Sequence, residues 1–376
     1  MQRKNCAALV CCSNARPRKE EKKIEELICF LRGMGFSVLP GELLYERQGV
    51  FGGTGRERAK ELMRFYRDPA VKVIFDISGG DIANGILPFL DFDVIAASRA
   101  EFWGYSDLTT VINAIYVKTG KTSVLWQARN LVGADSENQQ RRFASCAKEL
   151  CRAENAEEDN DLVWKRMSEK SFTDGSNASK NLSSDSNVLL QAVPAKIQQV
   201  LTKESSGIDY ATKIEGARGF CRKENESISA DNLEKKQTSG LRPGGDGLFD
   251  FDYRFVRGTA MRGIVTGGNT RCFLKLAGTP YWPDLRGKIL LLESLGGGLP
   301  QMDTAFAQLQ QMGAFDQAAG LLLGTFTHLE TTAGPDAALR LALSYTPKQL
   351  PIARTAQIGH GADARAIRIG EEISLN

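Results

Sequence analysis

Histidine is scarce in this sequence, and long apolar runs are missing from it. His328 and His360 are the only histidines among the 376 residues, so a hydrolase that needs an imidazole base has two candidates. No apolar run is long enough to span a bilayer. The apolar piece at 7–12 is too short for the core of a secretory signal. We therefore expect a cytoplasmic protein with no membrane partner.

The sequence has no large excess of charge and no paired-cysteine motif. Its 48 Lys and Arg and 45 Asp and Glu give a formal net charge of +3. The two signs are interleaved, which argues against a nucleic-acid partner. The eight cysteines include no CxxC pair, so we expect reduced cytosolic thiols and no structural zinc. No Gly and Lys spacing matches a phosphate loop, and no cofactor is expected.

The length and the change of composition along the chain predict two domains joined by an insertion. Residues 1–133 alternate short apolar runs with amphipathic segments, which is typical of a parallel sheet wrapped by helices. Residues 134–245 form a polar linker, richest in Ser, Asn, Asp, Glu and Lys from Ser168 to Leu241, which we expect to be partly disordered although 188–201 could form a helix. Residues 246–376 return to apolar strands and form a mixed α and β domain.

Local patterns predict individual elements within this frame. Strands are expected at 7–11, 36–39, 71–77, 288–292, 320–326 and 351–354. Apolar residues at helical spacing after Ile24 predict a helix that stops at Gly33, which suits a C-cap. Thr54 and Glu57 predict a capping box. Asp303 is expected to cap a helix in the second domain.

Ser106 lies in FWGYSDLTT, between a short apolar strand and a helix that begins near Leu108. A serine on such a sharp turn has the geometry of a nucleophile elbow. The N–H of Asp107 would then point from the helix N-terminus toward a developing oxyanion. An ordinary helix N-cap explains the same residues.

His360 and Glu293 are candidates for the base and the acid. His360 lies between glycines in IGHGADA, on an expected loop, whereas His328 is expected at the surface after a strand. Glu293 ends an apolar strand and could fix the tautomer of a histidine. A turn-capping histidine and a carboxylate that caps loop amides are the alternatives.

Gly79 and Gly80 follow the strand at 71–77, at the carboxyl end of a parallel strand, where open α/β sheets place ligands. Their amides can approach a substrate closely because no Cβ intervenes. The pair is either a second oxyanion donor or a tight turn.

These stretches, in this order, resemble the LD-carboxypeptidase family, which includes muramoyl-tetrapeptide carboxypeptidases and the peptidases of self-immunity to microcin C. The likeness is carried by SGGDIANGILPFLDFDVI, FWGYSDLTT, GIVTGGNTRCFLKLAGTPYWPDLRGKILLLES, AGLLLGTF and IGHG. It implies a triad of Ser106, Glu293 and His360, with oxyanion donors at Asp107 and at the turn of Gly79 and Gly80.

The resemblance also implies a fold and a reaction. The fold is an N-terminal α/β domain with the nucleophile and a smaller, swivelling C-terminal β/α domain with the acid and base, usually in a homodimer. The reaction is hydrolysis of the terminal L,D-peptide bond of a muropeptide tetrapeptide, with release of D-Ala through an acyl-enzyme.

The sequence departs from the family at positions expected to line the substrate pocket. Ser78 and Asp81 stand where the family commonly has Arg and Tyr, and residues 125–128 read Leu-Trp-Gln-Ala in place of a His-Gly-Pro step. One alternative is therefore an amidase for peptidyl-nucleotide conjugates, with Trp103 and Trp126 stacking on a base. Another is an inactive muropeptide-binding protein. A cysteine hydrolase using Cys11 or Cys12 is a third alternative.

Overall fold

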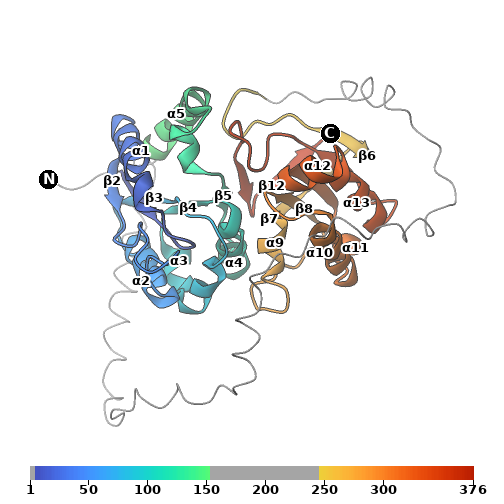
Figure 1. Ribbon diagram of the computed structural model, residues 1–376, viewed down its shortest axis with the longest axis horizontal. Helices are drawn as coiled ribbons and strands as arrows, with labels where there is room; N and C mark the ends of the chain where they lie inside the picture. Colours follow the sequence, from blue (N-terminus) through green and yellow to red (C-terminus); the bar gives the residue numbers. More distant parts are fainter. Residues whose placement is uncertain (1–4, 153–244) are drawn as a thin grey trace, which may run out of the picture. The chain divides into compact units, whose positions relative to one another are not determined.

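The computed structural model describes residues 5–152 and 245–376 (Figure 1). Two six-stranded sheets organise these residues, one built mainly from the first half of the chain and one from the second. Within these ranges no helix has both the length and the apolar character needed to cross a membrane. The helix predicted at 188–201 and most of the predicted insertion lie outside the described residues.

The first sheet has the strand order β11-β5-β4-β3-β1-β2. Strands β1 to β5 are parallel, and β11 pairs antiparallel with β5 at the edge. The strands predicted at 7–11, 36–39 and 71–77 are confirmed with shifts of about one residue at their ends. The bounds are β1 Cys6–Val10, β2 Ser37–Pro40, β3 Val71–Asp76, β4 Glu101–Gly104, β5 Ser123–Leu125 and β11 Ile367–Ile369.

Helices cover both faces of this sheet because successive strand residues point to opposite sides. On β3, Val73 and Phe75 pack with α1 and α5, whereas Ile74 between them belongs to the core that contains α2 and α4. The α-helices are α1 Glu21–Gly33, α2 Gly55–Tyr66, α3 Phe92–Ala97, α4 Thr109–Thr119 and α5 Ser136–Arg152, and the short 3₁₀ helices are η1 Arg18–Glu20, η2 Ala83–Phe89, η3 Ser106–Leu108 and η4 Ala128–Val132. This is the doubly covered parallel sheet that the sequence predicts.

Two predicted helix ends can be compared directly with the structure. The capping box of α2 is confirmed, because the Thr54 side chain accepts from the Glu57 amide and the Glu57 carboxylate accepts from the Thr54 amide. Gly33 is the last residue of α1, but the prediction that it provides the C-cap is wrong. Met34 is the cap, and the left-handed conformation falls on Gly35, with φ +96°.

The second sheet has the order β12-β7-β8-β9-β10-β6. Its central four strands are parallel, and antiparallel strands close both edges. The bounds are β6 Arg254–Arg257, β7 Met261–Asn269, β8 Lys288–Ser294, β9 Gly320–Phe326, β10 Ile352–Arg354 and β12 Glu372–Leu375, with helices α9 Thr270–Leu274, α10 Leu299–Gln311, α11 Ala314–Gln317, α12 Thr327–Ala333 and α13 Ala337–Tyr345. The predicted strands at 288–292, 320–326 and 351–354 are confirmed.

The helix α10 begins earlier than the sequence suggests. Gly298 is its N-cap and Pro300 occupies its first turn, where a missing N–H costs nothing and the fixed φ suits a helix. The prediction that Asp303 caps this helix is therefore wrong. Asp303 lies inside the helix, and its Oδ1 accepts from the Tyr345 hydroxyl at 2.7 Å.

Two segments extend the first domain beyond residues 1–133. The helix α5 occupies the first part of the predicted linker, because its Phe143 and Ala147 are buried against the first sheet. β11, which the sequence analysis assigns to the second domain, adds a strand to the first sheet through the pair Ile367 and Leu125. The second half of the chain therefore crosses back into the first sheet before it ends in β12.

Candidate active site

Ser106 is the first residue of η3, in a strained turn that follows β4. Its φ is +56°, which a residue with a Cβ adopts at a cost and which is characteristic of strained functional positions. Gly104, at the end of β4, makes this turn possible, because a Cβ there would lie 2.7 Å from the Cβ of Leu108. The predicted elbow is thus confirmed as a local conformation, although the second glycine of the usual GxSxG pattern is replaced by Leu108.

His360 lies on the loop that follows β10, and a glycine fixes its position. Gly359 has φ +141°, and a Cβ there would fall 1.9 Å from the Oγ1 of Thr325. The His360 amide donates to the same Oγ1 at 3.3 Å. The glycine before His360 thus lets the loop pack directly on β9.

Glu293 is completely buried near the end of β8. It lies beside Gly324 of the neighbouring β9, where a Cβ would come within 3.0 Å of the Glu293 Cβ. The Oε2 atom lies 2.7 Å from the Nδ1 of His360. The Oε1 atom has no hydrogen-bond partner within the described residues, so the carboxylate is committed to the imidazole.

The structure brings the three predicted triad residues together. The Ser106 Oγ lies 3.2 Å from the Nε2 of His360. The other ring nitrogen, Nδ1, faces Glu293. The His360 side chain is 8% exposed and Glu293 is not exposed at all, whereas Ser106 is half-buried. A serine, an imidazole and a buried carboxylate linked in this order have the geometry that activates a hydroxyl for nucleophilic attack.

Tyr105 forms a wall of this site that sequence analysis missed. Its ring centroid lies 4.4 Å from that of His360. Burial and then the charge of Glu293 raise the pKa of the phenol, so it stays neutral. Its hydroxyl has no hydrogen-bond partner in the part of the chain that the structure describes. Tyr105 therefore contributes a neutral, largely apolar surface against one side of the imidazole.

Gly79 and Gly80 form a turn that Asn14 holds in place. The Asn14 amide donates to the Gly79 carbonyl at 3.1 Å. Gly80 has φ +124°, and a Cβ on it would fall 2.2 Å from the Asn14 side chain. Ser78, just before the turn, accepts from the Ser13 amide at 2.9 Å and donates to Asp76. Both the left-handed conformation and the close approach require glycine at position 80.

Two adjacent cysteines follow β1 directly. Cys11 and Cys12 are buried, and burial, followed by the charge of Asp76, raises the pKa of both thiols well above its usual value. A thiol in such an environment is a poor nucleophile. The geometry therefore disfavours the cysteine-hydrolase alternative.

Asp107, directly after Ser106, contributes more than the amide that sequence analysis singled out. Its carboxylate is fully buried and accepts from the Ser13 hydroxyl at 2.6 Å and from the Ala83 amide at 2.7 Å. Lys275 of the second domain donates to the other oxygen at 2.6 Å and to the Asp81 carbonyl at 2.9 Å. The Asp107 amide is near the start of η3, where helix amides have no carbonyl partner inside the helix.

The TGGN motif at the end of β7 joins the second domain to the helix that follows the nucleophile. The Asn113 side chain of α4 donates to the Gly267 carbonyl at 2.9 Å and accepts from the Gly267 amide at 3.0 Å. The Thr109 Oγ1 accepts from the Asn269 amide at 3.0 Å. These contacts explain the motif as a docking element, in agreement with its lack of phosphate-loop spacing.

Three other candidates lie outside this geometry. The prediction that Trp103 and Trp126 could stack on a nucleobase is wrong, because both are 1% exposed and pack on each other with ring centroids 5.8 Å apart. Burying an indole in the core stabilises the fold more than leaving it in a polar cleft. His328 is exposed on α12, as expected of a surface histidine.

Comparisons with known proteins assign both halves of the chain to one family. The N-terminal domain model of the LD-carboxypeptidases matches residues 7–125, and the C-terminal domain model matches residues 262–375. The chain belongs to the LD-carboxypeptidase family. The matched segments contain Ser106 in the first domain and Glu293 and His360 in the second.

Individual relatives divide between two kinds of protein. The chain is 24% identical to the microcin C7 self-immunity protein MccF of Escherichia coli over 78% of this chain and 68% of that protein. It is 34% identical to a probable murein peptide carboxypeptidase of Bacillus subtilis over 27% of this chain and 32% of that protein. A crystal structure of an MccF-like protein from Bacillus anthracis aligns with a TM-score of 0.65 at 21% identity, over 100% of this chain and 94% of that one. This last likeness shows the shared fold.

Within the family, the departures of this chain have structural partners. Asp81 accepts from Arg271 of α9 at 2.9 Å, so the residue after the paired glycines is tied to the second domain. Ser78 is bonded to buried Asp76 and faces the interior. Trp126 is a core residue whose ring N–H donates to the Ala364 carbonyl at 3.1 Å.

Proposed function

We propose that this chain is a serine carboxypeptidase that hydrolyses the terminal L,D-peptide bond of muropeptide tetrapeptides and releases D-Ala. Ser106 is the nucleophile, His360 the general base and Glu293 the acid that orients it. The observation that supports this best is the chain of contacts from the Ser106 Oγ through His360 to a completely buried Glu293.

In the proposed reaction, the His360 Nε2 takes the Ser106 proton while the serine oxygen attacks the carbonyl of the terminal peptide bond. Glu293 accepts the Nδ1 proton in a hydrogen bond and stabilises the imidazolium that forms. The imidazolium then gives its proton to the departing amine, and an acyl-enzyme remains. Water, activated by the same imidazole, hydrolyses the ester and restores Ser106.

The amides of Asp107 and of Gly79 and Gly80 are the proposed oxyanion donors. Asp107 N–H lies at the start of a helix, where the dipole favours negative charge. Gly79 and Gly80 present backbone without side chains, and Asn14 holds their turn. Preorganised donors of this kind stabilise charge that develops only in the transition state.

The substrate class is supported by the family and by the murein peptide carboxypeptidase among the relatives. We further propose that the enzyme acts in peptidoglycan recycling in the cytoplasm as a homodimer, without a cofactor. Light scattering on the purified chain tests the dimer. A monomer at micromolar concentration would remove that part of the proposal.

Release of D-Ala from a muropeptide tetrapeptide tests the central claim. We expect turnover by the wild type and a loss of several orders of magnitude in Ser106→Ala. Ser98→Ala is the matched control, because Ser98 is a buried serine outside the triad. Equal rates for the wild type and Ser106→Ala would remove the serine from the mechanism.

A second candidate function is hydrolysis of a peptidyl-nucleotide or another peptide conjugate by the same triad. It is supported by the likeness to the microcin C7 self-immunity protein across most of this chain. Trp103 and Trp126 do not contribute to it, because both lie in the core. Parallel assays with a tetrapeptide and an aminoacyl sulfamoyl adenosine separate the two substrates by their ratio of kcat/KM.

A third reading is an inactive protein that binds muropeptides. A serine-directed phosphonate distinguishes it from an enzyme, since only an activated hydroxyl reacts covalently. Modification of Ser106 in the wild type and its absence in His360→Ala would support the enzyme. An unmodified wild type that still binds the tetrapeptide would favour the binding protein.

A further inference from the structure

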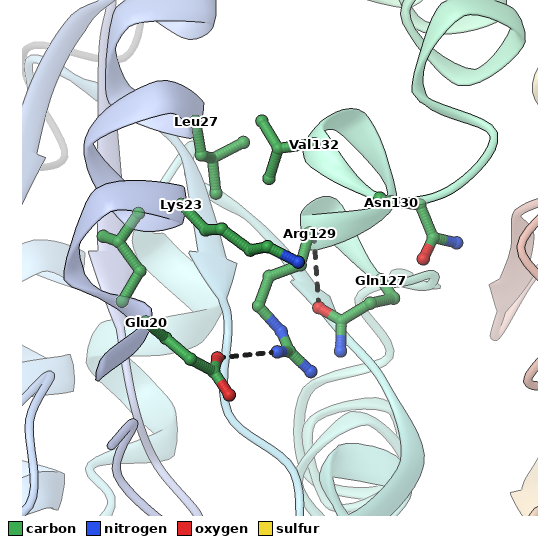
Figure 2. Close-up of a pocket in the computed structure, with 9 residues that line it drawn as sticks. Glu20, Lys23, Leu27, Gln127, Arg129, Asn130 and Val132 are labelled. Carbon is green, nitrogen blue, oxygen red and sulfur yellow. Dashed lines mark hydrogen bonds and ion pairs between the residues drawn. The ribbon is translucent and has the colours of Figure 1, made fainter. Parts of the chain in front are cut away.

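A cavity of about 210 Å³ lies between α1 and η4, away from the triad residues. Its apolar lining comes from Val132, which is partly exposed, and from Ile24 and Leu27, which are buried behind the surface. At about 30 Å³ per water molecule, it has room for roughly seven waters or one small organic molecule. Figure 2 shows its two walls, with the α1 side chains on one side and those of η4 on the other.

The polar part of this cavity carries an excess of positive charge. Lys23 and Arg129 line it together with one carboxylate, Glu20. That carboxylate is already engaged, because Arg16 donates to it at 2.6 Å and Arg129 at 3.2 Å. Burial, and then the neighbouring charge of Arg16, lower the pKa of Arg129. An arginine guanidinium nevertheless keeps its charge in proteins.

Lys23 lines the cavity and makes no ion pair within the part of the chain that the structure describes. Figure 2 shows its side chain extending from α1 toward η4, where the Arg129 guanidinium faces the same space. Gln127 adds an amide at the opposite wall, and its Oε1 already accepts from the Arg129 backbone at 3.4 Å. The remaining amide hydrogens of Gln127 are donors, so the wall offers donors and few acceptors.

We propose that this cavity binds a small carboxylate that carries a short aliphatic group. Lys23 and Arg129 hold the carboxylate through charge-assisted hydrogen bonds, and Arg129 presents a planar guanidinium suited to it. Val132, the partly exposed apolar residue of the lining, contacts the aliphatic part. The chemistry is that of an acylated amino acid, which occurs either as a free acid or as the end of a peptide.

The cavity is linked to the nucleophile through the backbone. Gln127 follows Trp126, whose amide donates to the Gly104 carbonyl at 2.8 Å, two residues before Ser106. On the other side, the lining residue Glu20 accepts from Arg16, which lies two residues after Asn14, the residue that holds the glycine turn. The cavity lining is therefore connected through hydrogen bonds to both segments that form the candidate active site.

Binding can be measured without turnover, so the inference does not rest on the proposed peptidase activity. The full chain is titrated with N-acetylleucine and with N-acetylleucinamide, which has the same size but no charge, and ligand-observed NMR follows binding. We expect the acid to bind more tightly than the amide. Lys23→Met should weaken binding of the acid about three- to tenfold, as is typical of one charge-assisted contact.

Lys22→Met is the matched control, because Lys22 is an exposed neighbour on α1 that does not line the cavity. It should leave the affinity unchanged. Equal binding of the acid and the amide, equal effects of the two lysine variants, or no binding of either probe would overturn the proposal. Lys23 is exposed, so its replacement leaves the fold intact, and circular dichroism verifies this.

The Ser106→Ala variant separates the two sources of the carboxylate. When the acid belongs to a bound peptide, Lys23→Met in the Ser106→Ala background also weakens binding of the tetrapeptide. When it is a free acid, only N-acetylleucine is affected. Both results support the cavity as a carboxylate site and differ only in what supplies the ligand.

Discussion

Lys275 of the second domain donates a 2.6 Å hydrogen bond to the buried carboxylate of Asp107, the residue directly after Ser106. The same ammonium donates to the Asp81 carbonyl, next to the glycine turn. One side chain of the second domain therefore contacts both segments that carry the proposed oxyanion donors. Its position couples the arrangement of the two domains to the geometry of the site.

Removing this ammonium should lower both stability and turnover. Lys275→Met leaves the Asp107 carboxylate buried with two neutral donors and no cation. Breaking a buried ion pair in this way costs about 3–5 kcal/mol, and because Lys275 is 22% exposed we expect about 2 kcal/mol. We expect kcat to fall more than KM rises, since the oxyanion donors act mainly in the transition state. Urea unfolding and steady-state kinetics measure the two effects.

Two further variants distinguish positioning from a general loss of stability. Lys275→Arg keeps the charge and should recover part of kcat. Arg271→Met removes the neighbouring cation, whose partner Asp81 is exposed, and should change stability by less than about 1 kcal/mol. Equal loss of kcat in Lys275→Met and Arg271→Met would contradict a positioning role for Lys275.

Much of the fold could be predicted because its signals are local. Apolar runs such as 71–77 and 320–326 mark buried parallel strands, and the Thr54 and Glu57 pair marks a helix start. The failures also have physical causes, one local and one dependent on distant contacts. Asp303 has the chemistry of a cap, but Pro300 already starts that helix. The strand β11 could not be predicted, because its partner β5 is far away in the sequence.

Some residues of the candidate site could be predicted from the sequence, and others could not. Ser106, Glu293 and His360 each stand beside a recognisable element end, and the family resemblance connected them. Lys275 and Tyr105 carry no such signal, because their roles depend on contacts between distant segments. Trp103 and Trp126 misled the sequence analysis, since an indole that stacks on a ligand and one that fills a core have the same local pattern.

The loop that carries His360 should be intolerant of a side chain at Gly359. Gly359→Ala would place a Cβ 1.9 Å from the Thr325 Oγ1, at φ +141°. We expect the loop to shift, the contact between His360 and Ser106 to break, and stability to fall by about 1–3 kcal/mol. Turnover and reaction with a phosphonate should both fall by at least tenfold.

Gly296→Ala is the matched control for this prediction. Gly296 follows Glu293 on a glycine-rich loop, but a Cβ there would meet nothing within 4 Å. It should leave kcat within about twofold of the wild type, as expected of a substitution without a steric contact. A larger effect in Gly296→Ala than in Gly359→Ala would show that the loop after β8, and not that after β10, controls the imidazole.

The charge of Glu293 should matter for turnover more than for the fold. Glu293→Gln keeps the shape of the side chain but removes the charge that stabilises the imidazolium. By the general behaviour of such triads, kcat should fall by about 10³–10⁴ with little change in KM. Stability should change little or rise, because a buried carboxylate with one unpartnered oxygen is replaced by a neutral amide. A kcat within tenfold of the wild type would remove Glu293 from the mechanism.

Unfolding measurements at acid pH should reveal how much Glu20 stabilises the fold through its contacts with Arg16 and Arg129. Burial opposes ionisation of this carboxyl, but the hydrogen bonds and charge of Arg16, followed by the charge of Arg129, hold its pKa below the usual 4.5. A lowered folded-state pKa stabilises the fold above the unfolded-state pKa, and that contribution is lost as the pH falls through the folded-state value. The wild type should therefore be more stable than Glu20→Gln at pH 7 by about 0.5–1 kcal/mol, since solvent screens the partly exposed pair. The difference should vanish as the pH is lowered below 4.5.

Urea unfolding at a series of pH values measures this stability difference. Glu25→Gln, which changes an exposed carboxyl in α1, is the control and should show no such trend. A stability difference that grows toward low pH would reverse the sign and contradict the assignment of Arg16 and Arg129 as its partners.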